Sequence, residues 1–236
     1  MPSNPKLSVK ILTIFPEIFP GPLAISLIGN GLKNNLWSLE VINIRDFGVT
    51  KHQTVDDEPF GGGCGMVMKP DVVSAAIEHA KQTMKAPQIF YTSPRGVKYC
   101  QKYAHEISLS KEIIIICGRF EGIDERIIEE YNVREISLGD FVLSGGETAA
   151  IAILDAAIRL IPGILANQDT LKEESFCNYK NIGTLLEYPQ YTRPALWKGR
   201  KVPEVLLSGN HKQIKDWRLN KSIEITKKQR PDLLEK

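Results

Sequence analysis

Residues 113–126 read Ile113-Ile-Ile-Ile-Cys-Gly-Arg-Phe-Glu-Gly-Ile-Asp-Glu-Arg126, and residues 136–147 read Ile136-Ser-Leu-Gly-Asp-Phe-Val-Leu-Ser-Gly-Gly-Glu147. Each stretch begins as an apolar run, typical of a buried strand, and leads into glycines and charged residues. In α/β proteins, ligands bind beyond the carboxyl ends of parallel strands. The two glycine-bearing loops therefore predict a pocket lined by backbone, which suits a flat small molecule that forms hydrogen bonds.

Strand-like and helix-like segments alternate up to about residue 165. The expected strands are rich in β-branched and apolar residues and comprise 9–15, 38–44, 88–92, 113–117 and 135–138. The expected helices comprise 22–34, 70–84, 97–108, 124–131 and 147–160. This alternation predicts an α/β fold with a mostly parallel sheet that carries helices on both faces.

The sequence predicts three parts. Residues 1–165 form the α/β domain, and the last helix of that domain stops at Pro162-Gly163. Residues 166–181 are polar, have no clear periodicity and are interpreted as a linker or mobile loop. Residues 182–236 form a small basic domain that is expected to be helical from about residue 210.

Composition excludes several classes of protein. The chain has 236 residues, of which 42% are hydrophobic and 25% charged, as in ordinary soluble domains. We find no apolar segment of signal-peptide or membrane-span length. The cysteines lie far apart, at 64, 100, 117 and 177, and so do the histidines. This spacing argues against a zinc site and favours reduced thiols in a cytoplasmic protein.

Charge is distributed unevenly. Residues 1–190 hold 18 Lys and Arg against 23 Asp and Glu, whereas residues 191–236 hold 12 against 5. A basic end on a mildly acidic body suggests a polyanionic partner. The alternative, a solvated helical face, is equally compatible with charge alone.

The start of the last helix of the α/β domain has a recognisable pattern. Ser144-Gly-Gly-Glu147 has the spacing of a capping box, which predicts reciprocal side-chain bonds at the helix N-terminus. The helix is apolar almost all round, and past its first turn it carries only the charges of Asp155 and Arg159. We expect that neither is an incidental solvent group. They form either an internal ion pair, which could lie at a subunit interface, or a site where Arg159 meets a substrate oxygen.

A nucleotide-binding loop is excluded. Gly61-Gly-Gly-Cys-Gly65 lacks the Gly-Lys-Ser/Thr ending of a P-loop, and the acids at 56–58 would repel phosphate. The first strand is also not followed by a glycine turn, as a dinucleotide-binding fold requires. The glycine loop is better interpreted as a flap with Pro59 and Phe60 at its tip.

Several motifs, in order along nearly the whole chain, resemble those of the bacterial tRNA (guanine-N1)-methyltransferase family. They are Asp56-Asp-Glu-Pro-Phe-Gly-Gly-Gly63, Tyr91-Thr-Ser-Pro-Arg-Gly96, the stretches 117–126 and 137–147, Ile161-Pro-Gly163, Tyr191-Thr-Arg-Pro194 and Ser208-Gly-Asn-His211. The resemblance implies a SPOUT-class fold with a C-terminal trefoil knot in the sheet domain. It also implies a homodimer, S-adenosylmethionine as methyl donor, and Mg²⁺. The implied substrate is guanosine 37 of tRNA, just 3′ of the anticodon and preceded by another guanosine.

Position by position, the resemblance places the donor against three loops of the SPOUT domain. The implied cofactor-binding residues are Tyr91, Thr92, Ser93, Pro94, Gly118, Phe120, Glu121, Gly122, Leu138, Gly139, Asp140, Phe141, Val142, Leu143, Gly145 and Gly146. Arg119 and Glu121 would lie near the sulfonium and the target base. A metal ion is expected near Glu121, Glu174 or Glu187.

The chemistry of the base can be argued independently. N1 of guanine carries a proton at neutral pH, so a carboxylate must accept that proton as the methyl group transfers. Negative charge then grows on O6 and requires a cation or a hydrogen-bond donor. The resemblance assigns this donor to Arg159 and the base to the linker, where the family's Asp-Ser-Phe is Glu174-Ser175-Phe176 here. Asp169 and Glu187 are the alternatives, and residues 177–184 are additional to the common spacing.

The basic tail matches an RNA substrate. Lys212, Lys215, Arg218 and Lys221 recur at every third position, so a helix would present them as a slowly turning strip that can follow phosphates. Trp217 is expected in the core rather than on a base. Two other functions stay open, namely a non-catalytic RNA-binding protein on the same fold and a SPOUT methyltransferase that acts on another RNA.

Overall fold

The computed structural model describes residues 4–49, 51–179 and 182–234. By its internal contacts the chain divides into two compact units, Met1–Ala166 and Asn167–Lys236, which are described separately. Among the described residues, no helix combines the length and apolar character needed to cross a membrane. The four cysteines are all free thiols, as the sequence predicts.

A five-stranded sheet forms the centre of the N-terminal unit. Its order is β2-β1-β6-β5-β7, and each neighbouring pair runs parallel. The strands are β1 (Leu7–Thr13), β2 (Trp37–Asn43), β5 (Gln88–Lys98), β6 (Glu112–Cys117) and β7 (Arg134–Ser137). The predicted α/β fold with a mostly parallel sheet is therefore confirmed.

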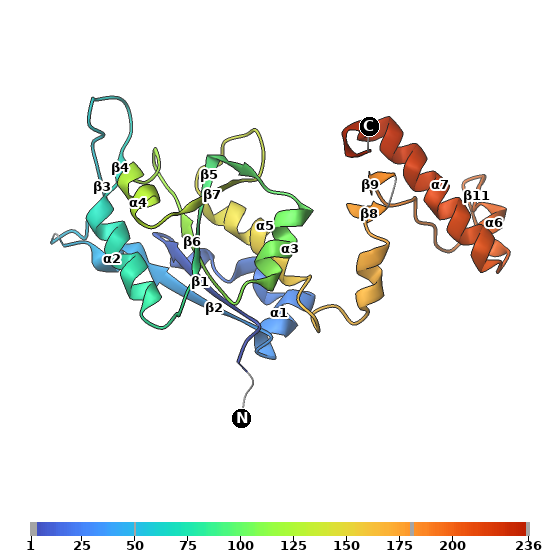
Figure 1. The fold of residues 1–236 in the computed structure, drawn as a ribbon, viewed down its shortest axis with the longest axis horizontal. Helices are drawn as coiled ribbons and strands as arrows, with labels where there is room; N and C mark the ends of the chain where they lie inside the picture. Colours follow the sequence, from blue (N-terminus) through green and yellow to red (C-terminus); the bar gives the residue numbers. More distant parts are fainter. Residues whose placement is uncertain (1–3, 50, 180–181, 235–236) are drawn as a thin grey trace. The chain divides into compact units, whose positions relative to one another are not determined.

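Helices cover both faces of this sheet (Figure 1). They are α1 (Ser26–Lys33), α2 (Pro70–Lys81), α3 (Gln101–Leu109), α4 (Glu125–Glu130) and α5 (Glu147–Ile158). Alternate residues of β6 point to opposite faces, so Ile113 and Ile115 pack with α1, α3 and α5, whereas Ile114 and Ile116 pack with α2 and α4. This two-sided burial explains why β6 is an uninterrupted apolar run.

Two predicted helices begin later than expected. Residues 21–24 form a short 3₁₀ turn (η2, Gly21–Ala24), and α1 starts only after it, where Ser26 has a positive φ of 56°. At 97–98, the chain is strand and not helix, because Val97 and Lys98 pair with Ile136 and Ser137 of β7 beyond a bulge. Gly96 permits this pairing, since a Cβ there would lie 2.4 Å from the backbone of residues 135–136.

Helix α5 differs from its prediction in two respects. The predicted capping box is wrong, because Gly146 is the N-cap residue and no side chain caps the helix. The helix is also not buried all round, since Thr148, Ala152 and Asp155 are exposed and Arg159 is half-buried. These residues recur at three- and four-residue spacing and therefore form one exposed stripe. Asp155 consequently faces solvent in the single chain, contrary to expectation.

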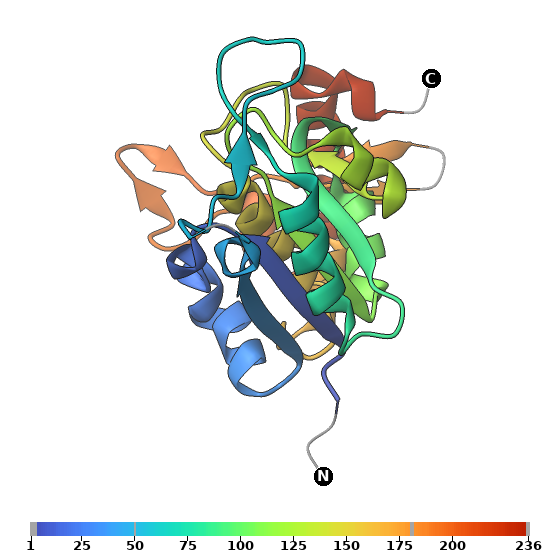
Figure 2. The ribbon, with the colours of Figure 1, turned by 90° about the vertical axis from the view of Figure 1, so that its left-hand side faces the viewer.

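The glycine-rich segment forms a long hairpin loop. Strands β3 (Asp56–Asp57) and β4 (Val67–Met68) pair antiparallel, and the loop between them projects from the N-terminal unit (Figure 2). Phe60 in this loop is fully exposed. The backbone amide of Glu121 donates to the carbonyl of Met66, which anchors the base of the loop near the turn after β6.

The C-terminal unit consists of two small hairpins and a long helix. Its elements are η4 (Gln168–Lys172), β8 (Cys177–Tyr179), β9 (Gly183–Leu185), β10 (Leu196–Trp197), β11 (Arg200–Lys201), α6 (Glu204–Leu207), α7 (His211–Gln229) and η5 (Pro231–Leu233). The segment 166–181 is therefore not irregular throughout, because β8 pairs with β9. Buried Thr226 of α7 accepts a hydrogen bond from the amide of Leu186 and so holds the second hairpin strand on the helix.

Candidate functional site

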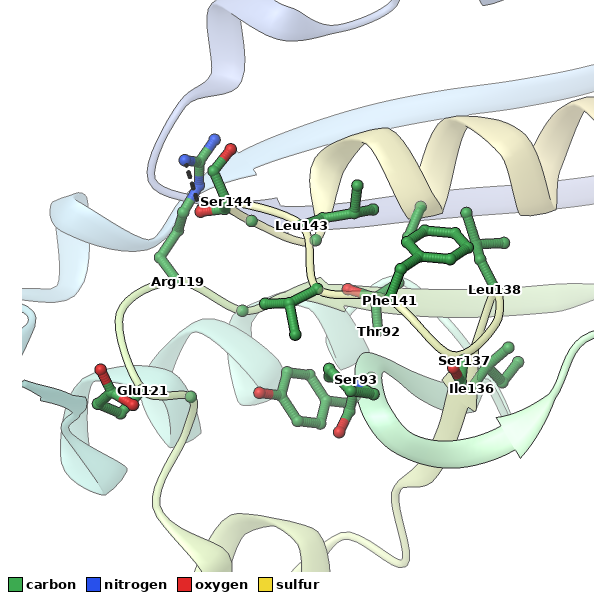
Figure 3. Close-up of a pocket in the computed structure, with 18 of the residues that line it drawn as sticks. Thr92, Ser93, Arg119, Glu121, Ile136, Ser137, Leu138, Phe141, Leu143 and Ser144 are labelled. Atoms are coloured by element: carbon green, nitrogen blue, oxygen red, sulfur yellow. Dashed lines mark hydrogen bonds between the residues drawn. The ribbon is translucent and has the colours of Figure 1, made fainter.

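A cavity of about 240 Å³ lies at the carboxyl ends of β6 and β7 and at residues 91–94 of β5, where the pairing of β5 with β7 is interrupted by a bulge. Figure 3 shows Arg119 and Ser144 on one side of it and Leu138 with Phe141 on another. Fifteen of the sixteen residues expected to bind the donor line this cavity, namely Tyr91, Thr92, Ser93, Pro94, Gly118, Phe120, Glu121, Gly122, Leu138, Gly139, Phe141, Val142, Leu143, Gly145 and Gly146. Asp140 does not line it, because its side chain is exposed and pairs with Lys98 at 3.5 Å.

The lining also includes residues that sequence reasoning missed. Ile136, Ser137, Ser144 and Ala149 contribute to the wall, in addition to Arg119. Ile136, Ser137 and Ser144 belong to the stretch 136–147, which also contains expected residues. Their place in the sequence could therefore have indicated them. Ala149 lies in the first turn of α5, and only the direction of the helix brings it to the cavity.

Two glycines allow the three loops to meet closely. A Cβ on Gly146 would lie 2.0 Å from Oγ1 of Thr92 and 2.9 Å from the Cα of Cys117. A Cβ on Gly118 would lie 2.5 Å from the ring of Tyr91. The amide of Gly146 donates to the carbonyl of Gly118 at 2.9 Å. The start of α5 is thus packed directly on Thr92 of β5 and on the end of β6, where no larger residue fits.

A buried ion pair fixes one wall of the cavity. Glu147 is only 1% exposed and accepts hydrogen bonds from Thr13 at 2.8 Å and from Nε of Arg119 at 3.0 Å. The Arg119 guanidinium lies over the ring of Phe15 at 4.5 Å and donates to the carbonyl of Ser144 at 3.1 Å. Glu147 therefore connects the end of β1, the loop after β6 and the helix start, which explains why it does not act as a capping residue.

The loop after β6 carries backbone strain. Phe120 has φ 59°, in the left-handed region that favours glycine, and its ring is half exposed at the cavity. Gly122, two residues further on, has φ 122°, which glycine adopts without strain. Unfavourable backbone conformations such as that of Phe120 concentrate at ligand sites, where the surroundings hold them in place.

Tyr91 lies beneath the loop after β6. Its side chain is buried, and this burial raises the pKa of its phenol, against the lowering effect of a backbone hydrogen bond at Ile123. The phenol therefore stays neutral at physiological pH. The neighbouring thiol of Cys117 is buried as well, and burial raises its pKa well above 9.0. Neither group is a candidate nucleophile, because the ionised form is disfavoured.

The two expected catalytic residues are not in the cavity wall. Arg159 follows the last turn of α5, whereas Gly146 at the other end of that helix lines the cavity. The twelve residues between them span roughly 18 Å. Within one chain, the structure thus does not bring Arg159 to the cavity. Glu174 belongs to the C-terminal unit and is half-buried.

The backbone around Glu174 is ordered by β9. The amide of Phe176 donates to the carbonyl of Leu185 at 2.7 Å, and the amide of Glu187 donates to Oγ of Ser175 at 3.0 Å. The adjacent Glu173 is engaged by Tyr188 and by Arg218. Glu187 accepts a hydrogen bond from Gln190. The side chain of Asp169 lies outside the described part of the structure.

The expected magnesium site is not supported. In the described residues, no three His, Cys, Asp or Glu side chains are grouped so that they could hold a metal ion. Glu121 belongs to the N-terminal unit, while Glu174 and Glu187 belong to the C-terminal unit. We therefore assign no step to Mg²⁺.

The four cations of the expected basic strip lie on α7 but differ in their surroundings. Lys212 and Lys215 are exposed. Arg218 instead pairs with Glu173 at 3.1 Å and lies over the ring of Tyr188, and Lys221 pairs with Glu224. Part of the strip is thus used within the protein.

A family model described as tRNA (guanine-1)-methyltransferase TrmD matches residues 7–236. A tRNA (guanine-N(1)-)-methyltransferase of Rickettsia akari (strain Hartford) is 56% identical over 228 residues, 97% of each chain. The protein of the same name from Wolbachia pipientis wMel is 57% identical over 227 residues, 96% of this chain and 95% of the relative. The similarity thus extends over both units.

Proposed function

The chain belongs to the tRNA (guanine-1)-methyltransferase family, and on this premise we propose that it transfers a methyl group from S-adenosylmethionine to N1 of guanosine 37 in tRNA. The observation that carries the proposal is the cavity formed by the irregular middle of β5 and the loops after β6 and β7, because fifteen residues expected to hold the donor line it. A tRNA substrate and four free thiols also support a cytoplasmic location.

The character of the cavity fits a nucleoside-containing donor. Its wall combines main-chain groups of glycine-rich turns with apolar side chains such as Leu138 and Leu143. Such a wall can hold a flat ring between apolar groups while backbone amides and carbonyls bind the polar edge. When bound, S-adenosylmethionine supplies an electrophilic methyl group on a sulfonium. The strained turn at Phe120 and the Arg119–Glu147 pair would keep this wall rigid.

The methyl acceptor needs a base. Guanine N1 becomes nucleophilic as its proton leaves, and a carboxylate placed there contributes about 10²–10⁴-fold to the rate. We assign this role to Glu174, because it stands where the family's Asp-Ser-Phe motif has its carboxylate. Glu174 also lies in a segment that the bonds of Ser175 and Phe176 hold to residues 185–187.

The negative charge that develops on O6 needs a hydrogen-bond donor, and we assign this role to Arg159. Because Arg159 lies at the far end of α5 from its own cavity, it would serve the cavity of a second copy. The exposed stripe of Thr148, Ala152 and Asp155 on the same helix supports close packing of such a copy. We therefore propose a homodimer whose two sites each combine residues of both chains.

Single-turnover methylation tests the reaction. The wild-type protein with S-adenosylmethionine and a tRNA transcript carrying guanosines 36 and 37 should yield 1-methylguanosine. Glu174→Gln should bind the donor normally and lose about 10²–10⁴-fold in rate. Glu173→Gln is the matched control and should stay within a few-fold of the wild-type rate. A near-normal rate for Glu174→Gln would transfer the role to Asp169 or Glu187.

Absence of product from well-folded wild-type protein would favour a non-catalytic RNA-binding protein. Product on other RNAs in a mixture, but not on this tRNA, would favour a methyltransferase with another substrate.

Complementation tests the shared site. Arg159→Ala removes the donor to O6, and Gly146→Ala obstructs the cavity, so each variant alone should be inactive. In a dimer with one chain of each variant, the intact cavity of the Arg159→Ala chain meets the intact Arg159 of the Gly146→Ala chain. Mixing the two variants should therefore restore part of the activity. If the mixture stays inactive although mixed dimers form, Arg159 does not act across the interface.

A further inference from the structure

The hairpin of β10 and β11 carries an exposed tryptophan. Trp197 is 57% exposed, whereas Trp37 is fully buried and Trp217 is half-buried against Tyr191, with ring centroids 6.2 Å apart. An indole has a large apolar face, and the exposed face of Trp197 is available to a partner that could cover it. Among the three tryptophans, Trp197 is therefore the one presented to a partner.

The turn of this hairpin is short and well defined. Trp197 is paired with Arg200 across a two-residue turn of Lys198 and Gly199, which have φ 49° and 78°. Positive φ at both positions is the geometry of a type I′ turn, which matches the twist of paired strands. No atom lies within 4 Å of a Cβ built on Gly199, so glycine serves the turn rather than close packing. The hairpin thus fixes the backbone that carries the indole.

The surroundings of the indole are basic. Residues 191–203 contain Arg193, Lys198, Arg200 and Lys201 and no acidic residue. The ammonium of Lys198 lies 5.0 Å from the centroid of the Trp197 ring. An aromatic ring among cations is the combination that binds single-stranded nucleic acid, because bases stack on the ring while phosphates meet the charges.

A hollow adjoins the hairpin. It has a volume of about 220 Å³ and is lined by Tyr191, Thr192, Arg193, Ala195, Val202, Leu206 and Leu207. Val202 donates its amide to the carbonyl of Ala195, so the wall of the hollow continues the hairpin ladder. The apolar wall with one tyrosine and one arginine extends the surface on which an unstacked base can lie.

We infer that hairpin 196–201 is an RNA-contact element in which Trp197 stacks on an unpaired base while Arg200 and Lys201 bind the adjoining phosphates. The charge complementarity of this surface favours RNA over an apolar protein partner. The inference rests on the proposed function, because it takes the partner to be the RNA substrate. It adds to the strip on α7 a contact that distinguishes unpaired from paired nucleotides.

RNA binding by the full chain, measured without methyl donor, tests the inference. The probes are a tRNA transcript and a fully paired RNA duplex of similar length. Trp197→Ala should weaken binding of the transcript by about 5- to 150-fold. The affinity of Trp197→Ala for the duplex should equal that of the wild type, because the indole cannot stack on bases that are already paired and stacked. Trp197→Phe should retain most of the affinity and lose the RNA-induced quenching of tryptophan fluorescence.

The contribution of Arg200 and Lys201 is tested by comparison with two other cations, Lys227 and Lys228. Arg200→Ala/Lys201→Ala should lower the salt dependence of transcript binding more than Lys227→Ala/Lys228→Ala, which removes two charges from the exposed end of α7. Unchanged transcript affinity in Trp197→Ala would overturn the inference. A changed sedimentation coefficient of Trp197→Ala without a changed RNA affinity would also overturn the inference, since it would mean that a protein surface covers the indole. Because no donor is present, failure of wild-type methylation would refute the proposed function and leave these binding results intact.

Discussion

The guanidinium of Arg119 lies 2.9 Å from the carboxylate of Glu147, and this pair joins the loop after β6 to the first turn of α5. The side chain of Glu147 is 2% exposed and that of Arg119 21%. Removing the partner of a buried charge lowers the free energy of unfolding strongly, whereas removing the partner of an exposed charge changes it little. The pair therefore governs both the stability of the N-terminal unit and the shape of its cavity.

Removing the buried carboxylate should destabilise the protein markedly. Glu147→Ala leaves Arg119 without its main acceptor, and we expect a loss of about 3–5 kcal/mol in the free energy of unfolding. Glu125→Ala is the control, because the Arg95–Glu125 pair is exposed and should contribute less than about 1 kcal/mol. Urea unfolding of both variants gives the comparison. A loss of less than about 1 kcal/mol in Glu147→Ala would mean that the buried pair contributes no more than an exposed one.

A single methyl group at Gly146 should obstruct the cavity. In Gly146→Ala the new Cβ meets Oγ1 of Thr92 and the backbone at Cys117, so the start of α5 must shift. We expect a loss of about 1–3 kcal/mol in stability and no calorimetric heat with S-adenosylmethionine. Ala75→Ser, at an exposed position of α2, should bind the donor like wild type. Donor binding by Gly146→Ala with wild-type affinity would contradict the proposed cavity.

The salt dependence of tRNA binding should separate the cations of α7. Lys212 and Lys215 are exposed, so replacing both by alanine should lower the slope of log K against log salt by about 0.7–0.9 for each lost phosphate contact. Lys221→Ala should change the slope less, because Lys221 is paired with Glu224. Arg218→Ala should mainly reduce stability through its lost contacts with Glu173 and Tyr188. If every variant had the same slope as the wild type, α7 would be excluded from the RNA surface.

Stability should fall in alkaline solution, partly through Cys117. Burial raises the pKa of this thiol above its ordinary value of 9.0. Above about pH 9 the unfolded chain loses this proton while the folded chain keeps it, so the free energy of unfolding decreases by about 1.4 kcal/mol per pH unit. Cys117→Ala should remove this component, whereas Cys64→Ala, at an exposed site, should not. Urea unfolding at about pH 8 and about pH 10 measures the difference.

The boundaries of the helices show where local sequence is insufficient. The run 97–108 has helical composition, yet Val97 and Lys98 extend β5 because β7 offers a partner. Ser144 and Glu147 have the spacing of a capping box, but Thr13 and Arg119 take up the Glu147 carboxylate. In both cases a residue distant in sequence supplied the better hydrogen bonds. The trefoil knot and the division into 1–165, 166–181 and 182–236 stay predictions.

By itself, the sequence determined the parallel sheet, the glycine-bearing loops and the family. These depend on local patterns, because an isoleucine run favours a strand buried on both faces and glycines permit the turns that follow it. The tertiary structure decided which groups meet. It placed Arg159 at the far end of α5 from the cavity, and it exposed Trp197 while Trp217 packs against Tyr191. Such pairings depend on contacts between distant segments, whose geometry only the folded chain sets.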